Sequence, residues 1–427
     1  MTPVRAVKGM NDVLPAEARR WQQVEAAFRS TMERLGYGEV RTPYVEPTGL
    51  FVRTIGEATD VVEKEMYSFK HRDDELTLRP EGTAGAARAY VEHKVHNSEP
   101  ITRWYYTGPM FRAERPQRGR YRQFSQVGAE VYGDAGPACD AEMIDALMRF
   151  LGDIGVPDAE VLLGSIGGPE TRATYRDALV AALTPVASTL SEDSQRRLST
   201  NPLRILDSKD PRDRAAVADV PKLDAHLSDA DRAHFDGLRR HLDALGTPYT
   251  VDTSLVRGLD YYTRTLFEIR GAKDKLGAGS TLVGGGRYDG MVKELGGPDV
   301  PAIGFAAGLE RLIIASDVAV APATVDALVA PVGEGAVDAA LVMGRDLRAA
   351  GVRCEVDARG ASVKSMLRRA NALGARVAIV VGERELAEGA VDVKDLASHS
   401  QVRVNIDKLA STVTETLARP ATTESAS

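Results

Sequence analysis

The strand pattern of this chain stops and then returns after a long helical stretch, and this interruption is the strongest constraint on its fold. Short strands broken by glycines run through residues 76–133, in segments such as ITRWYYTG and RQFSQVGAEVYG. Residues from about 170 to 245 are instead helical, polar and rich in Arg, Asp and Ala, and strands resume in residues 247–270. We therefore expect an α+β domain over residues 1–320, with an antiparallel sheet and a helical insertion.

The N-terminal part of this domain carries a helix signal followed by an extended stretch. Apolar residues recur at three- and four-residue steps, namely Trp21, Val24, Phe28, Met32 and Leu35. Gly36 follows where a left-handed helix cap would fall, so the pattern predicts an amphipathic helix over residues 17–35. The next stretch contains Pro43 and Pro47, which suit an irregular strand or a sheet edge.

Beyond residue 320 the period changes to alternating strands and helices. The linker AVAPAT, residues 319–324, precedes three apolar strand patterns separated by two helix patterns. We expect a small α/β domain over residues 325–418 and a disordered tail over residues 419–427. The GEG of residues 333–335 and Asp357 imitate part of a dinucleotide-binding fingerprint, but a helix-start turn explains them better because the third glycine is missing.

Composition limits the classes of partner. The chain has 54 basic and 61 acidic residues, a net charge of −7, and so lacks a global basic field with which to coat nucleic acid. Any nucleic-acid contact is therefore expected to be local.

The N-terminus has no apolar signal region, and no apolar run approaches the roughly 20 residues that cross a bilayer. We expect a cytoplasmic protein that makes no membrane contact.

Metal and disulfide chemistry have weak support. Cys139 and Cys354 are too few and too far apart in sequence for a zinc cluster or a disulfide framework, so both are expected to be reduced and structural. His93 and His96 have the spacing of a metal pair, but no third ligand is in view, and a solvated helix face is the simpler explanation. We assign no protein ligand to a metal.

The most informative segment is FRAERPQRGRYRQFSQVGAEVYG, residues 111–133. Its first half contains five arginines and, as their only acidic neighbour in that half, Glu114. The arginines are Arg112, Arg115, Arg118, Arg120 and Arg122. Guanidinium groups suit phosphate oxygens, although a solvated arginine face is the alternative. Gln126 and Glu130 share one side of the strand that follows, which indicates a lined cavity.

These residues resemble the signatures of the class II aminoacyl-tRNA synthetases. FRAE before the arginine-rich loop is similar to the second signature motif, and AIGFAAGLERL, which ends in Arg311 and Leu312, is similar to the third. LVRGLDYYTRTLFE and GGGRYDGMV resemble the motifs of the histidyl-tRNA synthetase family. KGMNDVLP, TLRPEGTA and NPLRILDSK also resemble that family, so the likeness covers nearly the whole chain.

The resemblance implies an enzyme with a C-terminal anticodon-binding domain. It would activate histidine with ATP and Mg²⁺ to histidyl-adenylate, releasing pyrophosphate, and then transfer histidine to the 3′ end of tRNA(His). It also implies a homodimer, formed around residues 41–47 and the helix before them. The alternative is a related non-catalytic, histidine-sensing regulatory subunit of ATP phosphoribosyltransferase, whose relatives generally lack the C-terminal domain and show eroded signatures.

The resemblance also implies roles for individual residues. Arg112 and Arg257 would be catalytic, with Arg112 on the α-phosphate of ATP and Arg311 near the γ-phosphate. Arg115 and Gln117 would reach the tRNA acceptor end. The histidine-binding residues would be Glu81, Gly82, Thr83, Arg112, Gln126, Glu130, Arg257, Tyr261 and Tyr262.

Two questions stay open from the residues alone. Tyr261 and Tyr262 are adjacent, and if both lie on a strand their side chains point to opposite faces, so we expect unequal roles. Gly284 to Gly286 either allow the backbone to approach the pocket closely or form a flexible turn. The chain contains no GxxxxGK[ST], HExxH or GxSxG motif, which argues against a P-loop nucleotidase, a zincin and an α/β-hydrolase.

Overall fold

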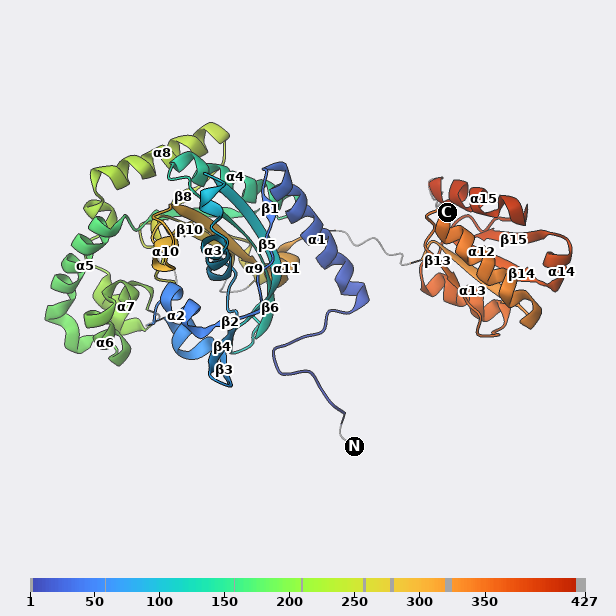
Figure 1. Cartoon of the computed structure of the whole chain (residues 1–427), viewed down its shortest axis with the longest axis horizontal. Helices are drawn as coiled ribbons and strands as arrows, with labels where there is room; N and C mark the ends of the chain where they lie inside the picture. The colour runs from blue at the N-terminus through green and yellow to red at the C-terminus, as the bar shows by residue number, and fades with distance from the viewer. Residues whose placement is uncertain are drawn as a thin grey trace. The chain divides into compact units, whose positions relative to one another are not determined.

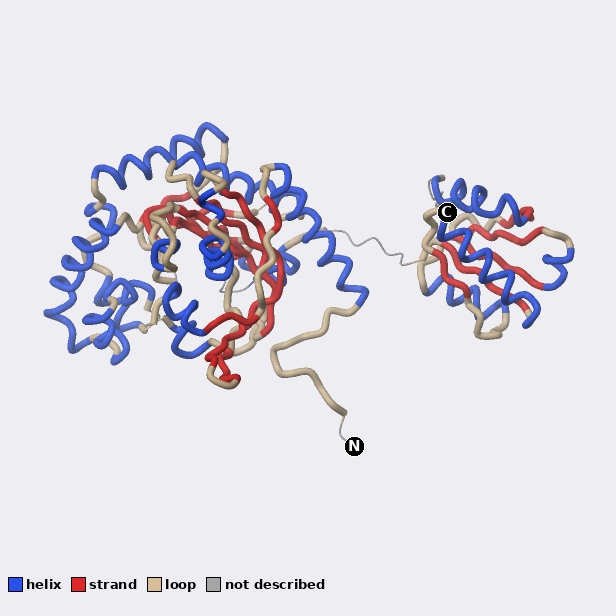
Figure 2. The backbone as a smooth tube through the Cα atoms, viewed as in Figure 1, coloured by secondary structure: helices blue, strands red, loops and turns tan. Residues whose placement is uncertain are grey.

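The computed structural model describes residues 3–57, 59–156, 158–208, 210–255, 259–276, 280–318 and 325–419. The chain forms two compact units, residues 1–319 and 320–427, which are described separately here. Figure 1 labels their elements, and Figure 2 distinguishes helices from strands.

An eight-stranded sheet forms the centre of the first unit. The end pairs β1–β5 and β7–β8 are parallel and the other neighbours are antiparallel. The strands, in their order across the sheet, are β1 (Gly38–Glu39), β5 (Thr102–Phe111), β6 (Gln123–Tyr132), β11 (Ala302–Gly308), β10 (Thr281–Arg287), β9 (Thr263–Arg270), β7 (Glu160–Ser165) and β8 (Thr250–Val251). Strands from before and after the helical stretch therefore share one sheet, as the interrupted pattern predicts.

The two faces of this sheet bury different layers. Val127, Ala129 and Val131 of β6 join the main apolar core, to which five helices contribute: α1 (Pro15–Arg34), α4 (Pro137–Asp153), α8 (Asp229–Leu245), α9 (Lys273–Leu276) and α11 (Leu309–Ala315). Tyr132 packs on the opposite face with α3 (Thr83–Glu92) and α10 (Met291–Glu294). Because β6 alternates, Gln126 and Glu130 lie on this second face.

Smaller elements complete the first unit. A three-stranded antiparallel sheet has the order β2 (Val45–Pro47), β4 (Asp74–Leu78) and β3 (Tyr67–His71). The proline-containing stretch thus places β2 at a sheet edge, as predicted. The remaining helical elements here are α2 (Thr48–Ile55), the π-helix η1 (Val61–Glu65) and the 3₁₀ turn η2 (Val95–Asn97).

The stretch between β7 and β8 is helical and has an apolar cluster of its own. Tyr175, Leu179 and Leu183 pack there with Leu190, Ile205 and Leu223. We call these residues, 169–227, the helical module: α5 (Pro169–Leu183), η3 (Thr184–Thr189), α6 (Glu192–Thr200), η4 (Pro202–Asp207), α7 (Pro211–Val217) and η5 (Leu223–His226). Helix α8 follows, but its Leu238 and Leu242 pack in the main core beneath the sheet.

The second unit is a mixed five-stranded sheet with helices. Its order is β13 (Cys354–Val356), β12 (Ala327–Val332), β14 (Val377–Gly382), β15 (Ala390–Asp395) and β16 (Gln401–Asn405), with the first three parallel. The helical elements are η6 (Glu334–Ala336), α12 (Val337–Ala349), α13 (Val363–Ala372), α14 (Glu383–Ala387), η7 (Ile406–Lys408) and α15 (Leu409–Ala418). The three predicted strands and two predicted helices are all present, whereas β15, β16, α14 and α15 were not predicted.

Several sequence predictions have definite outcomes here. Helix α1 ends before Gly36, whose φ of 79° is the predicted left-handed cap. The run Gly284 to Gly286 belongs to β10 in the sheet and is not a flexible turn. Asp357 accepts hydrogen bonds from Arg359 Nε and Nη2, both at 2.6 Å, so its carboxylate is occupied by that arginine. The predicted linker and most of the predicted tail lie outside the described residues.

The cysteines and the two histidines singled out above also have clear places. Cys139 is buried in the main core, where burial raises the pKa of its thiol to about 12, and Cys354 is half-buried on β13. His93 caps the end of α3 and is exposed, while His96 lies in η2 with its ring 6.0 Å from that of Tyr90. His93 and His96 therefore do not share one helix face.

Candidate active site

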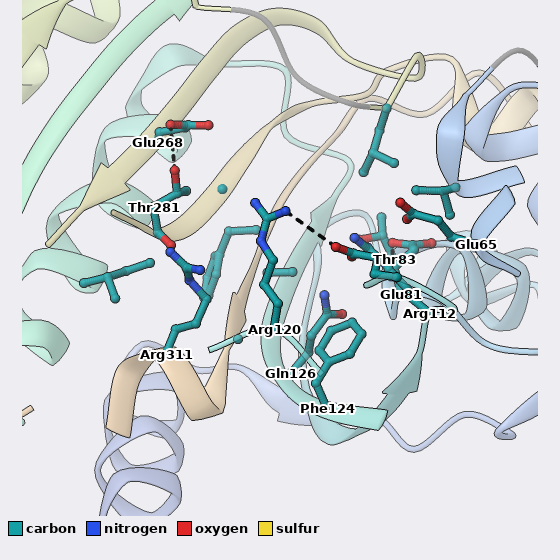
Figure 3. A pocket seen from close by; sticks show the side chains of 18 of the residues that line it. Glu65, Glu81, Thr83, Arg112, Arg120, Phe124, Gln126, Glu268, Thr281 and Arg311 are labelled. Atoms are coloured by element: carbon teal, nitrogen blue, oxygen red, sulfur yellow. Dashed lines mark hydrogen bonds and ion pairs between the residues drawn. The ribbon is translucent and has the colours of Figure 1, made fainter. Parts of the chain in front are cut away.

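A cavity of about 410 Å³ opens on the second face of the large sheet. Its floor comes from β6, β10 and β11 and its walls from the start of α3, the end of β5 and the residues before β9. Figure 3 shows Glu81, Thr83 and Arg112 on one side, Thr281, Glu268 and Arg311 on the other, and Arg120 between them. The arginine-rich loop and the glycine-rich strand thus meet at one site.

Arg112 follows the last residue of β5 and is held by the backbone. Its Nε donates to the carbonyl of Pro80 at 2.9 Å, and its guanidinium carbon lies 5.5 Å from the centre of the Phe124 ring. Its Nη groups make no hydrogen bond to any described residue and the side chain lines the cavity. A planar cation is therefore fixed in place with donors left for a ligand.

The segment from Glu81 to Thr83 forms the start of α3. The carboxylate of Glu81 accepts the backbone N–H groups of Thr83 at 2.9 Å and Ala84 at 2.7 Å, so it caps the helix. Burial raises the pKa of Glu81, and these two hydrogen bonds oppose the rise. A Cβ on Gly82 would lie 2.2 Å from Cε2 of Tyr106, so only glycine fits there.

Gln126 and Glu130 lie on the cavity side of β6 at different depths. Gln126 lines the cavity, and its buried Oε1 has no hydrogen-bond partner among the described residues. Glu130 is fully buried behind Gly304 and Tyr288 and accepts the hydroxyls of Tyr106 at 3.0 Å and Tyr288 at 2.5 Å. Burial raises the pKa of the Glu130 carboxyl to about 8.

Tyr261 and Tyr262 both line the cavity, and the prediction that strand alternation would separate them is wrong. They lie in the turn before β9, and their ring centres are 4.7 Å apart. The Tyr261 ring also meets Tyr288 edge-on at 5.6 Å. The two tyrosines differ in depth, because Tyr262 is only 4% exposed and Tyr261 is half-buried.

An irregular backbone beyond the tyrosines accompanies this arrangement. Arg264 has a φ of 50°, a left-handed conformation that is rare for a side chain of its size, and the pairing of β9 with β10 shifts register between Gly286 and Arg287. Arg264 Nε donates to Asp231 at 3.1 Å, which stabilises this conformation. Regular alternation therefore begins only after Arg264.

The opposite end of the cavity combines a cation with two carboxylates. Arg311 of α11 donates through Nε to the carbonyl of Thr281 at 2.7 Å, and burial together with nearby Arg120 lowers the pKa of Arg311. Glu310 accepts the backbone N–H of Ser125 at 2.9 Å, and burial raises its pKa to about 7. Glu268 accepts the hydroxyl of Thr281 at 3.1 Å.

The five arginines of the loop do not act as one group. Arg112 and Arg120 line the cavity, whereas Arg115 and Arg118 are exposed with Gln117 near the loop tip. Arg122 donates to the carbonyl of Glu114 at 3.2 Å and its backbone N–H donates to the carbonyl of Gly9 at 2.7 Å, so it secures the N-terminal segment. Arg257 lies outside the described residues.

Several cavity residues were not predicted from the sequence, among them Tyr288, Glu268 and Glu310. Each of these three stands inside a segment that the sequence analysis quotes, GGGRYDGMV, LVRGLDYYTRTLFE or AIGFAAGLERL. Which members of these segments face the cavity depends on strand register, and no local pattern reveals that register.

Comparisons with known proteins agree along the whole chain. Residues 9–312 match the family model described as Histidyl-tRNA synthetase, and residues 326–416 match that of an anticodon binding domain. The histidine–tRNA ligase of Sorangium cellulosum (strain So ce56) is 58% identical over 404 residues, which cover 95% of this chain and 94% of the relative.

Solved structures give the same result. The crystal structure of apo S. aureus histidyl-tRNA synthetase is 33% identical, with a TM-score of 0.82, and the match covers 96% of this chain and 100% of that one. A Bacillus halodurans C structure described as an ATP phosphoribosyltransferase regulatory subunit/histidyl-tRNA synthetase covers 88% of this chain and 98% of that one, with a TM-score of 0.65. Its 21% identity supports only a shared fold.

The antiparallel sheet, the arginines around its cavity and the separate C-terminal unit together define a class II aminoacyl-tRNA synthetase. This confirms the predicted fold class and the resemblance on which it was based. The chain belongs to the histidyl-tRNA synthetase family. The regulatory-subunit alternative is not favoured, because the C-terminal domain is present and the close relative is a ligase over nearly its full length.

Proposed function

We propose that the cavity carries out the reaction of a histidine–tRNA ligase, the activity that family membership assigns to the chain. Histidine and ATP form histidyl-adenylate and pyrophosphate, and histidine then passes to the 3′ end of tRNA(His). The observation that carries this proposal is one cavity with Arg112 and Arg311 on opposite sides and the buried carboxylate of Glu130 behind its floor.

The arginines suit the first step because two anions must meet. The histidine carboxylate, already ionised at neutral pH, attacks the α-phosphate without a general base, and charge grows on the phosphoryl oxygens. Arg112 would stabilise that charge and Arg311 would hold the γ-phosphate, since each is already positioned by a backbone carbonyl. Arg257 would lie between the histidine carboxylate and the α-phosphate, a role that rests on the motif LVRGLDYY alone.

The other wall suits the substrate side chain and its ammonium group. Glu130 would accept an imidazole N–H and so fix the tautomer, which an apolar pocket could not do. Tyr261 and Tyr262 would flank the ring, with Tyr288 as a further member through its bond to Glu130. Gln126, with its unpartnered Oε1, would bind the ammonium group together with Thr83, Glu81 and the backbone at Gly82.

Mg²⁺ would neutralise part of the phosphate charge. The described residues contain no cluster of three side chains able to hold a metal ion, but Glu268 and Glu310 supply carboxylates beside Arg311 in the same cavity. Oxygen donors of this kind fit Mg²⁺, which commonly takes one or two carboxylates and fills its other positions with phosphate oxygens and water. An ion held by the nucleotide is therefore compatible with these residues.

The tRNA would contact the chain at two places. Arg115 and Gln117 are exposed in the loop whose Gly119 and Arg120 line the cavity, as a contact with the acceptor end requires. The C-terminal unit would read the anticodon through specific contacts.

We also propose a homodimer that uses β2 and the region of α1. No described helix could span a membrane, and we place the enzyme in the cytoplasm by analogy with its family.

The test is ATP–pyrophosphate exchange measured with each amino acid in turn. We expect exchange with histidine alone, and charging of tRNA(His) by the same preparation. Histidine binding without exchange would instead identify a regulatory protein, and exchange with a different amino acid would overturn the assignment of the cavity. Light scattering on the active enzyme tests the dimer, which a 45.9 kDa particle at full activity would exclude.

A further inference from the structure

Three side chains of the helical module bind Asp260 and Tyr262, the residues on either side of Tyr261 in the cavity wall. Asn201 Nδ2 donates to Oδ2 of Asp260 at 3.0 Å, and Arg204 Nε donates to Oδ1 of Asp260 at 3.0 Å. The Nη2 of Arg204 also forms an ion pair with Oδ1 at 2.9 Å. Arg172 of α5 donates to the carbonyl of Tyr262 at 3.2 Å. Each oxygen of the Asp260 carboxylate is thus held by a different residue of the module.

The opposite side of this segment is fixed by the catalytic domain. The backbone N–H of Asp260 donates to the carbonyl of Ile55, the last residue of α2, at 3.3 Å. Gly56 leaves room for the carboxylate, because a Cβ there would lie 2.9 Å from Oδ2 of Asp260. The segment is therefore clamped between α2 and the module.

The side chains that make these contacts are largely shielded from solvent. The side chain of Arg204 is 13% exposed and that of Asp260 is 27% exposed. Burial lowers the pKa of Arg172, as expected for a guanidinium with restricted access to water. The cavity that remains between the module and this segment is only about 50 Å³, so the two surfaces pack closely around their hydrogen bonds.

We propose that Asn201, Arg204 and Arg172 are positioning residues for histidine: Asn201 and Arg204 act from the helical module through Asp260, and Arg172 acts directly on Tyr262 of the Tyr261–Tyr262 pair. The inference rests on the proposed role of these tyrosines in the histidine pocket. The module then controls amino-acid binding selectively, because the two ATP arginines depend on other anchors: Arg112 on Pro80 and Arg311 on Thr281. Loss of the clamp lets the tyrosine rings move while the phosphate-binding groups stay in place.

The test compares histidine and ATP in pyrophosphate exchange. Asn201→Ala and Arg204→Ala should each raise the KM for histidine by about five- to tenfold and change the KM for ATP less than about twofold. Arg204→Lys should recover part of the loss, since it restores one charged donor but not the fork. On an Asp260→Asn background, Arg204→Ala should add little, because the two side chains act as one unit.

A matched control removes another arginine of the same module. Arg196 of α6 has a side chain that is 78% exposed and pairs only with Asp193 among the described residues, so Arg196→Ala should leave both KM values unchanged. Thermal unfolding of each variant shows whether the module is intact. Arg204 also lines the cavity, so Asn201→Ala, which removes only the neutral donor to Asp260, separates positioning from a direct contact and carries the test if Arg204→Ala does not fold.

The outcomes separate this inference from the proposed function. If Glu130→Gln raises the KM for histidine but folded Asn201→Ala and Arg204→Ala do not, the clamp has no positioning role and the inference is overturned. Equal rises in the KM for histidine and for ATP would also overturn it, because they indicate general loosening of the unit. If Glu130→Gln leaves the KM for histidine unchanged, the proposed histidine pocket itself is wrong.

Discussion

The carboxylate of Glu130 lies directly against Gly304, its pairing partner on the neighbouring strand β11. A Cβ built on Gly304 would fall 1.6 Å from Oε2 of Glu130 and 2.8 Å from the carbonyl oxygen of Ala129. The side chain of Glu130 thus occupies the space that any other residue at position 304 would need. A buried carboxylate and a glycine on the next strand form one structural unit.

Gly304→Ala should therefore displace Glu130 and weaken histidine binding. We expect a rise of at least about tenfold in the KM for histidine and a loss of about 1–3 kcal/mol in stability, the usual cost of overpacking a filled site. Pyrophosphate exchange and urea unfolding measure the two effects. Gly152→Ala, where no atom lies within 4 Å of the new Cβ, is the control. Unchanged histidine kinetics in Gly304→Ala would show that Glu130 does not contact the substrate.

Glu130 should also give the ligand-free enzyme a distinct pH dependence. Its pKa, raised by burial to about 8, exceeds the value of about 4.3 expected in the unfolded chain. Between these two values the folded state keeps a proton that the unfolded state releases, so its contribution to the free energy of unfolding falls as pH rises.

The Glu130→Gln variant cannot ionise and should lose this part of the slope. The Tm of the wild type should therefore fall relative to that of Glu130→Gln as the pH is raised from 5 to 8. Glu310, with a pKa raised to about 7, contributes the same slope to both proteins and cancels in the comparison. A difference that stays constant over this range would mean that Glu130 is already ionised at pH 5.

Arg257→Ala should lower the rate of adenylate formation by about two to three orders of magnitude, as loss of a transition-state donor does. Transfer of histidine from preformed adenylate to tRNA should suffer less, since pyrophosphate has already left. Arg257→Lys should recover only part of the rate. Single-turnover measurements separate the steps, and a near-normal rate of adenylate formation at saturating ATP and histidine would remove Arg257 from the catalytic residues.

Truncation after residue 318 should separate the two activities. The apolar clusters of the two units share no residues among those described, and every arginine assigned to ATP precedes the cut. We expect pyrophosphate exchange to persist and tRNA charging to fall. Parallel loss of both activities in a truncated protein that still unfolds cooperatively would contradict this division.

Asp213→Asn should loosen the helical module. The Asp213 carboxylate is fully buried and accepts the hydroxyls of Ser191, Ser194 and Ser208 at 2.6–2.7 Å. Burial alone would raise its pKa, but these bonds and the backbone N–H of Ser191 lower it to about 2. Its stabilising effect is therefore full above the unfolded pKa of about 3.9 and is lost as pH falls toward 2.

An amide at position 213 cannot accept all of these hydroxyls, so we expect a loss of about 1–3 kcal/mol. Hydrogen exchange in α6 and α7 should accelerate, and exchange in β6 should not. Asp219→Asn, on an exposed position of the same module, is the control. Equal exchange rates in both variants would show that the serine contacts contribute nothing to the module.

The sequence predicted those parts of the fold that local chemistry specifies. Helix α1 and its glycine cap follow from spacing, and β2 at a sheet edge follows from its prolines. The position of Arg112 at the end of a strand beside the cavity also agreed with the motif. Strands β15 and β16 were missed because their half-exposed pattern is interrupted by charged residues and is no stronger than that of a loop.

The error at Tyr261 and Tyr262 has a longer-range cause. They lie in the turn before β9 and not on the strand, and the strand begins irregularly at the left-handed Arg264, which is held by Asp231 more than thirty residues earlier in the chain. Arginine has no local preference for that conformation, so no neighbouring residue signals the break in alternation. Tyr288 was missed for a related reason, since its hydroxyl reaches Glu130 only after β6, β11 and β10 have paired.

The glycine run of β10 limits which positions can alter the amino-acid specificity of the pocket. Gly284 lines the cavity, a Cβ on Gly285 would lie 2.4 Å from the Phe267 ring, and one on Gly286 would lie 2.4 Å from the carbonyl oxygen of Thr265. At Gly284 the backbone itself is the cavity surface, and the close contacts at Gly285 and Gly286 leave no room for a side chain on the rest of the run. Laboratory evolution toward another amino acid would therefore have to work through the tyrosines, Gln126 and Glu130, with this glycine run left unaltered.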